Sequence, residues 1–275
     1  MTRIFLPPEQ LTSDDITITG DNARHLSLVL RINPGESIIV FDGQGYRYEC
    51  TVQKVHKKEI IALLNKKEPY SVESPLSIIL AQGIAKGEKM DLIVQKSTEL
   101  GVSKIIPLVT ERTEVRHTQK VERWRKIAHS ASQQSGRDRV PEITEPMKMD
   151  HFLSVIPAKA GIQKKGWIPD QACLSGRQGR NDKKRQSRLI DNRYLGLILS
   201  ESHSERNLKQ LLCDLKDISE ITLLVGPEGG FSKEEVGTAV DKGFLEVSLG
   251  PRILRTETAP IAAISIIQYE RGDMG

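Results

Sequence analysis

The sequence contains only three cysteines, scattered at Cys50, Cys173 and Cys213, and no Cys-x-x-Cys pair. Neither a disulfide framework nor a zinc site is supported by this spacing, and no metal is expected. No apolar run approaches the roughly 18 residues of a membrane helix, and the first ten residues lack the apolar core of a signal peptide. We therefore expect a cytoplasmic protein without membrane contact.

Two nucleotide-binding motifs are also missing. The sequence has no G-x-x-x-x-G-K-[ST] loop to hold a triphosphate. It has no G-x-G-x-x-G after the first strand of a βαβ unit. Because each motif builds a phosphate-binding loop, their absence argues against a nucleotide hydrolase and against a Rossmann-type methyltransferase.

Outside one segment, the chain has no excess of positive charge. The formal net charge is +4. Between Ile156 and Arg193, ten Lys or Arg stand against three Asp, so the rest of the chain carries −3. Global charge therefore does not by itself indicate a nucleic-acid partner.

The densest structural signals lie toward the C-terminus. The apolar run 221–225 precedes Gly226-Pro227, which predicts a buried parallel strand that ends in a turn. Ser232 and Glu235 form a capping box, so we expect a helix from about Lys233 to Gly243.

A second loop follows that helix. Residues 246–249 are typical of a short strand, and Gly250-Pro251 begins a loop that carries Arg252, Arg255 and Glu257 between apolar residues. Isolated glycine turns usually have only a geometric role, but two such loops with embedded charges favour a ligand site. Because both loops follow parallel strands, we expect them at one edge of the sheet, where open α/β sheets bind ligands.

The N-terminal part has a different pattern. Residues 1 to about 70 alternate apolar and polar positions, and short strands are expected at 37–41, 46–55 and 59–64. A small β-barrel would close these strands, either with a packing role only or as an RNA-binding module. A linker is expected at residues 68–75.

The next stretch predicts a parallel βαβ unit, with strands at 75–81 and 104–109 around a helix at 88–100. A further helix is indicated by apolar residues at helical spacing between Val121 and Ala131. This spacing places Trp124 in the core rather than on a surface for stacking bases.

Basic residues surround that further helix. Some of them are explained by a solvated helix face. RNA phosphates could contact the arginines on either side of the helix, which are Arg112 and Arg116 before it and Arg137 and Arg139 after it.

Residues 155–193 break every pattern on either side of them. Their Gly-, Lys-, Arg- and Gln-rich composition cannot bury a core, so we expect an inserted, mobile surface loop, with nucleic-acid contact as the alternative. A strand resumes at 195–200 and is followed by a helix that Ser204 caps. Its apolar stripe is Leu208, Leu211, Leu212 and Leu215.

Several stretches together resemble one known family, that of ribosomal RNA small subunit methyltransferase E (RsmE). They are GPEGGFS at 226–232, LGPRILRTETAP at 249–260, KGEKMDLIVQKSTELGV at 86–102, PLVTERT at 107–113, QQSGR at 133–137, HLSLVLRINPGE at 25–36 and VFDGQGYRY at 40–48. The resemblance covers nearly the whole chain apart from the insertion. The stretch 249–260 is its most specific part.

The resemblance implies an α/β fold of the SPOUT class, in which a parallel sheet carries a C-terminal deep trefoil knot behind a small PUA-like β-barrel. The RNA-binding barrel would comprise residues 1–70 and the methyltransferase domain residues 75–275, with 155–193 inserted and the knot within roughly 195–270. The implied activity is S-adenosylmethionine-dependent methylation of uridine N3 in small-subunit (16S) ribosomal RNA, acting on the ribosomal subunit.

The resemblance also implies a homodimer built on the last helix. That helix carries Ala262, Ala263, Ile266 and Ile267 at helical spacing, which gives an apolar face of small and branched residues. No membrane partner and no metal are implied.

Site residues follow from the same resemblance. The cofactor would lie on the backbone of three loops, and the residues expected there are Leu199, Ser200, Val225, Gly226, Gly230, Leu249, Ile253, Leu254, Thr256, Thr258 and Ala259. RNA contacts are expected from Arg24, Arg31, Arg112, Arg116 and Arg137.

The chemistry suggests the catalytic candidates. Uridine N3 must lose a proton to attack the methyl group, so Arg255 or Arg252 could stabilise the resulting anion and Glu257 could accept the proton. Glu257 could instead only favour the helix N-terminus and pair with an arginine. Two other functions also stay open, namely a SPOUT enzyme acting on transfer RNA and a non-catalytic RNA-binding protein.

Overall fold

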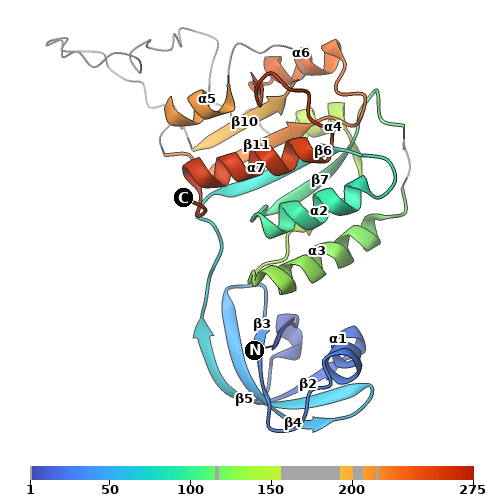
Figure 1. Cartoon of the computed structure of the whole chain (residues 1–275), viewed down its shortest axis with the longest axis vertical. Coiled ribbons are helices and arrows are strands. Elements are labelled where there is room, and N and C mark those ends of the chain that lie inside the picture. Colours follow the sequence, from blue (N-terminus) through green and yellow to red (C-terminus); the bar gives the residue numbers. More distant parts are fainter. Residues whose placement is uncertain (1, 115–117, 156–192, 201–206, 215–216) are drawn as a thin grey trace, which may run out of the picture.

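A computed structural model describes residues 2–114, 118–155, 193–200, 207–214 and 217–275. The chain forms two sheets joined by the segment 70–76 (Figure 1). Nearly all of the expected insertion at 155–193 lies outside the described residues, and so do Arg116, Ser204 and Leu215.

The N-terminal sheet has five strands in the order β1-β3-β4-β5-β2. They are β1 (Thr2–Phe5), β2 (Asp15–Thr19), β3 (Ser37–Phe41), β4 (Tyr46–Val55) and β5 (Glu59–Pro69), with the short helix η1 (Pro8–Gln10) after β1. The predicted strands at 37–41 and 46–55 are confirmed, whereas β5 runs on to Pro69 and shortens the expected linker.

This sheet is open between β1 and β2 within the described residues, where a closed barrel was expected. After β2, the helix α1 (Gly20–Arg24) continues into the π-helix η2 (His25–Val29). These turns contribute Ala23 and Leu26 to the apolar core of the N-terminal part. A helix therefore completes the core in place of a further strand.

The second sheet follows the order β12-β10-β11-β6-β7-β8, and β9 pairs with β7. All of its strand pairs are parallel. The strands are β6 (Ser77–Gly83), β7 (Lys104–Val109), β8 (Glu142–Ile143), β9 (Met147–Lys148), β10 (Tyr194–Leu199), β11 (Glu220–Val225) and β12 (Leu245–Val247). Parallel pairing brings the carboxyl ends of β6, β10, β11 and β12 to one edge.

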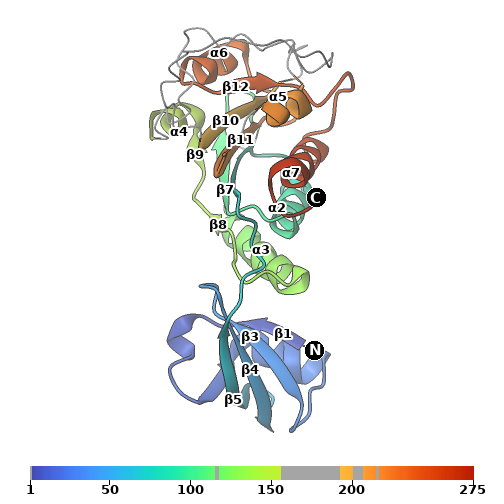
Figure 2. The same cartoon turned by 90° about the vertical axis from the view of Figure 1, so that its left-hand side faces the viewer.

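Helices cover both faces of this sheet (Figure 2). They are α2 (Lys89–Glu99), α3 (Val121–Ser135), α4 (Met149–Val155), α5 (Leu208–Asp214), α6 (Lys233–Asp241) and α7 (Thr258–Arg271). Along β6, Ile78 and Leu80 pack in the core shared with α2, α3, α5 and α7, while Ala81 packs in the core shared with α4 and α6. The alternation matches the period of a strand that is buried on both faces.

Several local predictions are confirmed. The βαβ unit is formed by β6, α2 and β7. Ser232 caps α6 by accepting from the Glu235 N–H at 3.2 Å, and the Glu235 carboxylate accepts from the Ser232 N–H at 2.9 Å. Trp124 is 1% exposed and donates its indole N–H to Asp91, so it is a core residue.

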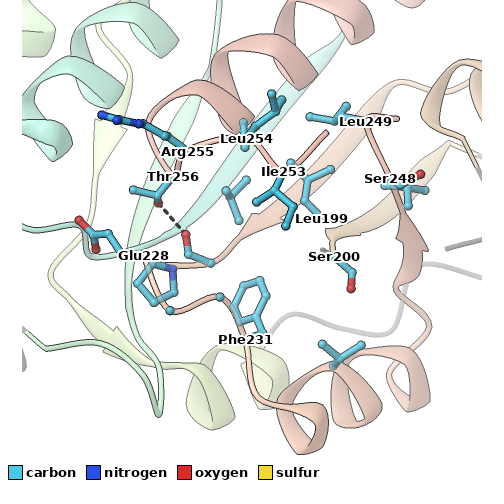
Figure 3. Close-up of a pocket in the computed structure, with 18 of the residues that line it drawn as sticks. Leu199, Ser200, Glu228, Phe231, Ser248, Leu249, Ile253, Leu254, Arg255 and Thr256 are labelled. Carbon is cyan, nitrogen blue, oxygen red and sulfur yellow. Dashed lines mark hydrogen bonds between the residues drawn. The ribbon is translucent and has the colours of Figure 1, made fainter. Parts of the chain in front are cut away.

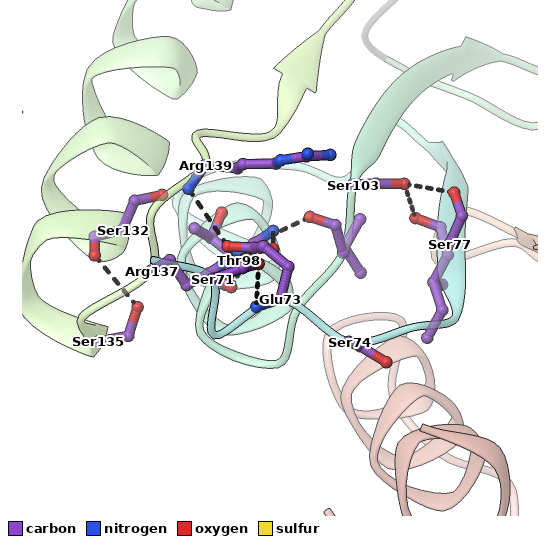
Figure 4. A network of polar contacts seen from close by, with 12 residues as sticks. Ser71, Glu73, Ser74, Ser77, Thr98, Ser103, Ser132, Ser135, Arg137 and Arg139 are labelled. Carbon is purple, nitrogen blue, oxygen red and sulfur yellow. Dashed lines mark hydrogen bonds and ion pairs between the residues drawn. The ribbon is translucent and has the colours of Figure 1, made fainter. Parts of the chain in front are cut away.

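Arg137, at the junction between the two sheets, is 5% exposed and lies among polar partners (Figure 4). Its guanidinium binds the Glu73 carboxylate of the connecting segment and donates to the carbonyls of Thr98 and Val102 at 2.9 and 2.8 Å. The expectation that Arg137 binds an RNA phosphate is therefore wrong, because its donors are used inside the protein. It instead joins the connecting segment to the second sheet.

Asp138 beside it is fully buried, and in its protonated form it hydrogen-bonds to the neighbouring Glu73 carboxylate. Burial, followed by the neighbouring Glu73 carboxylate, raises the pKa of Asp138 to about 6. Burial also opposes the ionisation of Glu73, but the hydrogen bonds and charge of Arg137 outweigh it, so the pKa of Glu73 is lowered.

This environment predicts how Asp138→Asn affects stability. In the unfolded chain Asp138 ionises near pH 4, whereas in the folded protein it keeps its proton until about pH 6. The contribution of Asp138 to the free energy of unfolding therefore falls as pH rises from 4 to 6, by about 3 kcal/mol. Urea unfolding should show Asp138→Asn close to wild type at pH 4 and more stable by that amount at pH 8.

Asp150→Asn serves as the control, because Asp150 is exposed at the start of α4. Replacing this exposed side chain should change the free energy of unfolding by less than about 0.5 kcal/mol. An Asp138→Asn difference that is equally flat from pH 4 to 8 would contradict the buried, proton-retaining carboxyl.

Two of the cysteines lie in described parts of the chain, and both are free. Cys50 is buried, and this burial raises its thiol pKa to about 12. No cluster of three or more metal-ligating side chains is found among the described residues. Among the described helices, none combines the length and the apolar character that crossing a membrane requires.

Candidate functional site

A cavity of about 970 Å³ opens at the carboxyl edge of the second sheet (Figure 3). Its walls come from the ends of β10 and β11, from β12, and from the loops at 226–232 and 248–256. The loops that the sequence predicted at one edge therefore meet around one cavity. This edge is where ligands bind in open parallel sheets.

Ten of the eleven residues expected at the cofactor line this cavity. They are Leu199, Ser200, Val225, Gly226, Gly230, Leu249, Ile253, Leu254, Thr256 and Ala259. Arg252 and Arg255 line it as well. Thr258 is the exception, because it is exposed as the first residue of α7 and is not part of the wall.

Glu257 also lies outside the cavity wall. Its side chain is 15% exposed at the N-cap of α7, and Oε1 is 4.0 Å from the Arg255 guanidinium. Its Oε2 is buried and has no hydrogen-bond partner among the described residues. The expected role as proton acceptor is not supported by this position, and pairing with an arginine at the helix start is what the structure shows.

A buried amide that the sequence patterns missed joins the loops behind the cavity. Gln82, fully buried near the end of β6, donates to the carbonyls of Gly83 and Gly226 at 3.0 and 3.2 Å and lies 3.4 Å from the Thr256 hydroxyl. The Thr256 hydroxyl donates to the Gly226 carbonyl at 2.8 Å (Figure 3). Three separate segments are therefore held together at the floor of the cavity.

Glycine is required where these segments touch. A Cβ on Gly83 would lie 2.5 Å from the ring of Pro227, and a Cβ on Gly226 would lie 3.0 Å from the backbone of Gly230. Both distances are shorter than ordinary van der Waals contact, so larger residues would displace the loop 226–232, which lines the cavity.

Charged side chains form the rim of the cavity at one end. Glu228 accepts from the Lys86 N–H at 3.0 Å and from the Lys89 ammonium at 2.9 Å. Burial opposes the ionisation of Glu228, but the Lys89 hydrogen bond and backbone N–H groups outweigh it, so its pKa is lowered. Arg112 donates to the Gly229 carbonyl at 2.9 Å on the same loop.

Lys89 and Glu228 were missed by the sequence reasoning. The available signal was that each follows a predicted strand, β6 or β11, and that these strands are neighbours in a parallel sheet. Residues after neighbouring parallel strands meet at the same edge. Because each is a charged residue in such a loop, within the motifs GEK and GPEGG, both could have been predicted to lie at the rim.

The cavity has an apolar wall and a basic rim. Leu199, Leu249 and Leu254 offer surface to a flat or aliphatic ligand, while exposed backbone and Ser200 offer hydrogen bonds. Arg255, whose side chain is 83% exposed, extends at the rim. The residues present therefore fit an adenosine-sized ligand inside the cavity and an anionic partner at its mouth.

Arg24 and Arg31 lie far from this cavity, in the N-terminal part (Figure 1). Both are exposed, and Arg31 has a positive φ of 52° directly after the η2 region. Of the residues that were expected to bind RNA and that the structure describes, only Arg112 lines the cavity.

Comparison with known proteins places the site in context. Residues 72–165 and 180–268 match the family described as an RNA methyltransferase domain, and residues 18–65 match an RNA methyltransferase PUA domain. The chain is 30% identical to ribosomal RNA small subunit methyltransferase E of Bacillus subtilis, over 99% of this chain and 100% of that protein. It is 31% identical to the enzyme of the same description from Buchnera aphidicola subsp. Acyrthosiphon pisum, over 98% of this chain and 94% of that one.

A solved structure shows the same similarity. The crystal structure of a ribosomal RNA small subunit methyltransferase E from Neisseria gonorrhoeae, bound to S-adenosyl methionine, matches with a TM-score of 0.79. The two sequences are 33% identical, and the match covers 100% of both chains. The likeness thus extends over the N-terminal sheet as well as the cavity.

Proposed function

The chain belongs to the ribosomal RNA small subunit methyltransferase E family, and from this we propose that it transfers a methyl group from S-adenosylmethionine to N3 of a uridine in small-subunit ribosomal RNA, acting on the ribosomal subunit. The observation that carries the proposal is the cavity at the carboxyl edge of the sheet, in which ten of the expected cofactor residues meet. The Neisseria gonorrhoeae relative is bound to the same cofactor.

S-adenosylmethionine would supply an electrophilic methyl group on a sulfonium. The loops 226–232 and 248–256 would hold it through backbone groups, with Leu199, Leu249 and Leu254 as apolar wall. Gly226 lets the loop 226–232 fold back against Gly230, and Gln82 with Thr256 ties this loop to the loop at 248–256. These residues bind and orient the donor and keep water from it.

Methylation of N3 needs charge stabilisation, because N3 of uridine carries a weakly acidic proton. Negative charge develops on the uracil oxygens as this proton leaves. Arg255 extends from the loop at the rim with most of its side chain in solvent, and Arg252 lines the same cavity. We assign the stabilisation of this charge to Arg255, with Arg252 as the second candidate.

The RNA would be held by both parts of the chain. Arg112 stands at the cavity rim with a guanidinium that also supports Gly229. Arg24 and Arg31 are exposed on the N-terminal part, whose residues 18–65 match a PUA domain. Contacts to phosphates from these positions would orient the RNA without reading its sequence.

The knot of the SPOUT class is part of this proposal, together with a division of the chain into an RNA-binding part at 1–70 and a methyltransferase part at 75–275. The chain leaves β12 at one edge of the sheet and returns past Gly226 before it enters α7. Helix α7 then packs against α5 and α2. This path is what a chain threaded through the loop at 226–232 would follow.

We also predict a homodimer. On α7, Ala263 and Ile267 are buried in the protein's own core, so the face expected for the partner narrows to its partly exposed neighbours Ala262 and Ile266, with Tyr269 beside them at 65% exposure. Covering these side chains would remove apolar surface from water. Light scattering at micromolar concentration should give twice the mass of the 30.8 kDa chain, and the mass of one chain would contradict the prediction.

The alternatives are separated by one experiment. A SPOUT enzyme for transfer RNA would leave small-subunit RNA unmodified, and a non-catalytic RNA-binding protein would not bind S-adenosylmethionine in calorimetry. Mass-spectrometric mapping of small-subunit RNA from a deletion strain should show that one N3-methyluridine is lost. Unchanged methylation of that RNA would contradict the proposed function.

A further inference from the structure

Within the described residues, two carboxylates line the cavity, Glu228 and Glu246. Glu246 lies in β12, two positions before Ser248. Figure 3 shows Glu228 and Arg255 extending toward the end of the cavity that is opposite Ser248. An acidic side chain and the proposed anion-stabilising arginine therefore share the same end of the site.

The two oxygens of Glu228 have different surroundings. The Lys86 N–H and the Lys89 ammonium both donate to Oε1, at 3.0 and 2.9 Å, and Oε2 accepts from neither of them. The side chain is 27% exposed, which leaves it accessible from the cavity mouth. One oxygen therefore fixes the orientation of the carboxylate while the other can receive a hydrogen bond from a substrate.

The surrounding charges keep this carboxylate ionised at neutral pH, as its lowered pKa indicates. Lys89 itself lines the cavity, so an ammonium donor stands directly beside the carboxylate acceptor. Arg255 offers further donors at the same end. The rim thus presents an acceptor flanked by donors.

Uracil carries the complementary pattern on its Watson–Crick edge. Its two oxygens accept hydrogen bonds, and the N3–H between them donates one. Cytosine has an unprotonated N3 at the same place, which a carboxylate would repel. A buried or partly buried group of the wrong polarity discriminates strongly, because one partner is left unpaired.

We propose that Glu228 is a catalytic residue that accepts the N3 proton of the target uridine and thereby selects uridine over cytidine. Lys89 and Arg255 donate to the two uracil oxygens. This inference rests on the proposed function and names the group that removes the proton in it. It replaces Glu257, which lies outside the cavity wall.

The methyl transfer breaks two bonds and forms two. The N3–H bond breaks and its proton passes to Oε2 of Glu228. The electron pair left on N3 forms the bond to the methyl carbon, and the pair of the carbon–sulfur bond remains on sulfur. Glu228 then releases the proton to solvent, which restores the carboxylate.

Glu228→Gln tests the proposal with little change of shape, because the amide oxygen can still accept from the Lys86 N–H and from Lys89. Its single-turnover methylation rate on small subunits from a deletion strain should fall at least a hundredfold at pH 7. The variant rate should then rise about tenfold per pH unit toward pH 9, as the uridine ionises without help. Wild type should stay nearly flat over the same range.

Two readouts separate catalysis from a structural role. Calorimetry should give the Glu228→Gln variant an S-adenosylmethionine affinity within threefold of wild type. Subunits reconstituted on RNA with cytidine at the mapped position should bind wild type at least tenfold more weakly than uridine subunits, a preference that Glu228→Gln should lose. Glu234→Gln, exposed on the first turn of α6 and outside the cavity, is the matched control.

The outcomes are distinct. Wild-type rate in Glu228→Gln at pH 7, or a rate loss matched by an equal loss of cofactor affinity, would overturn the inference and leave the proposed function standing. Failure of the wild-type protein to form N3-methyluridine would instead overturn the proposed function.

Discussion

Replacing Gly83 with alanine should weaken S-adenosylmethionine binding at least a hundredfold, although Gly83 does not line the cavity. A Cβ at this position would lie 2.5 Å from both the nitrogen and Cδ of Pro227. Ordinary contacts lie at 3.4 to 4 Å, so Pro227, which lines the cavity, would have to move by about 1 Å. Strain of about 3 kcal/mol at the cofactor loop corresponds to this loss of affinity.

Calorimetry measures this effect, and thermal unfolding shows whether the variant keeps its fold. Gly226→Ala is a milder version, because its Cβ would meet the backbone of Gly230 at 3.0 Å. Gly237→Ala is the control, since a Cβ there meets nothing within 4 Å and alanine favours helix α6. Wild-type affinity in a folded Gly83→Ala protein would show that cofactor binding does not need the close approach of Pro227 to the end of β6.

The second large effect concerns Arg255. Arg255→Ala should reduce the methylation rate a hundredfold to a thousandfold, while the affinities for S-adenosylmethionine and for small subunits stay within threefold. The side chain is 83% exposed and its carboxylate partner Glu257 is 4.0 Å away, so little stability depends on it. A group that acts mainly on developing charge affects turnover more than ground-state binding.

Single-turnover kinetics with calorimetry on the same preparations measure this split. Arg255→Lys keeps the positive charge and should recover part of the rate, because the ammonium lacks the planar pair of donors. Lys242→Ala, exposed at the end of α6, should match wild type. If Arg255→Ala methylates at the wild-type rate, the anion is stabilised elsewhere, and Arg252 becomes the next residue to replace.

The parts of the fold that could be predicted from the sequence depend on local signals. The capping box of Ser232 and Glu235 fixes the start of α6 through residues three positions apart. The apolar run before Gly226 and the turn after it similarly place β11 and its loop. The same signals placed the two loops at one edge of the parallel sheet, while the individual cofactor residues were implied by the family resemblance.

The parts that could not be predicted depend on partners far apart in the chain. Gln82 meets Thr256 across 174 positions, and a glutamine in an apolar strand gives no sign of this contact. Arg137 was assigned to RNA because its charge suggests the surface, but Glu73, 64 positions away, binds it in the interior. Neither the composition nor the periodicity of the sequence indicates which distant residues will contact each other.

The helical turn at 20–29 was missed for a different reason. Its residues continue the mixed apolar and polar pattern of the neighbouring strands. The π-helix η2 is also too short to show a recognisable hydrophobic period in the sequence. Glu257 and Thr258 were expected in the site but lie outside the cavity wall at the start of α7, whereas Ala259 in the next position lines it. Helix boundaries are set by packing as much as by the residues themselves.

The most direct test of the central claim is methyl transfer with purified components. Small subunits from a deletion strain would be incubated with the protein and S-adenosylmethionine carrying an isotopically labelled methyl group, and the RNA digested and mapped by mass spectrometry. We expect one labelled methyl group per subunit, on N3 of a single uridine. Label on another atom or base, or no label from a protein that binds S-adenosylmethionine, would contradict this activity.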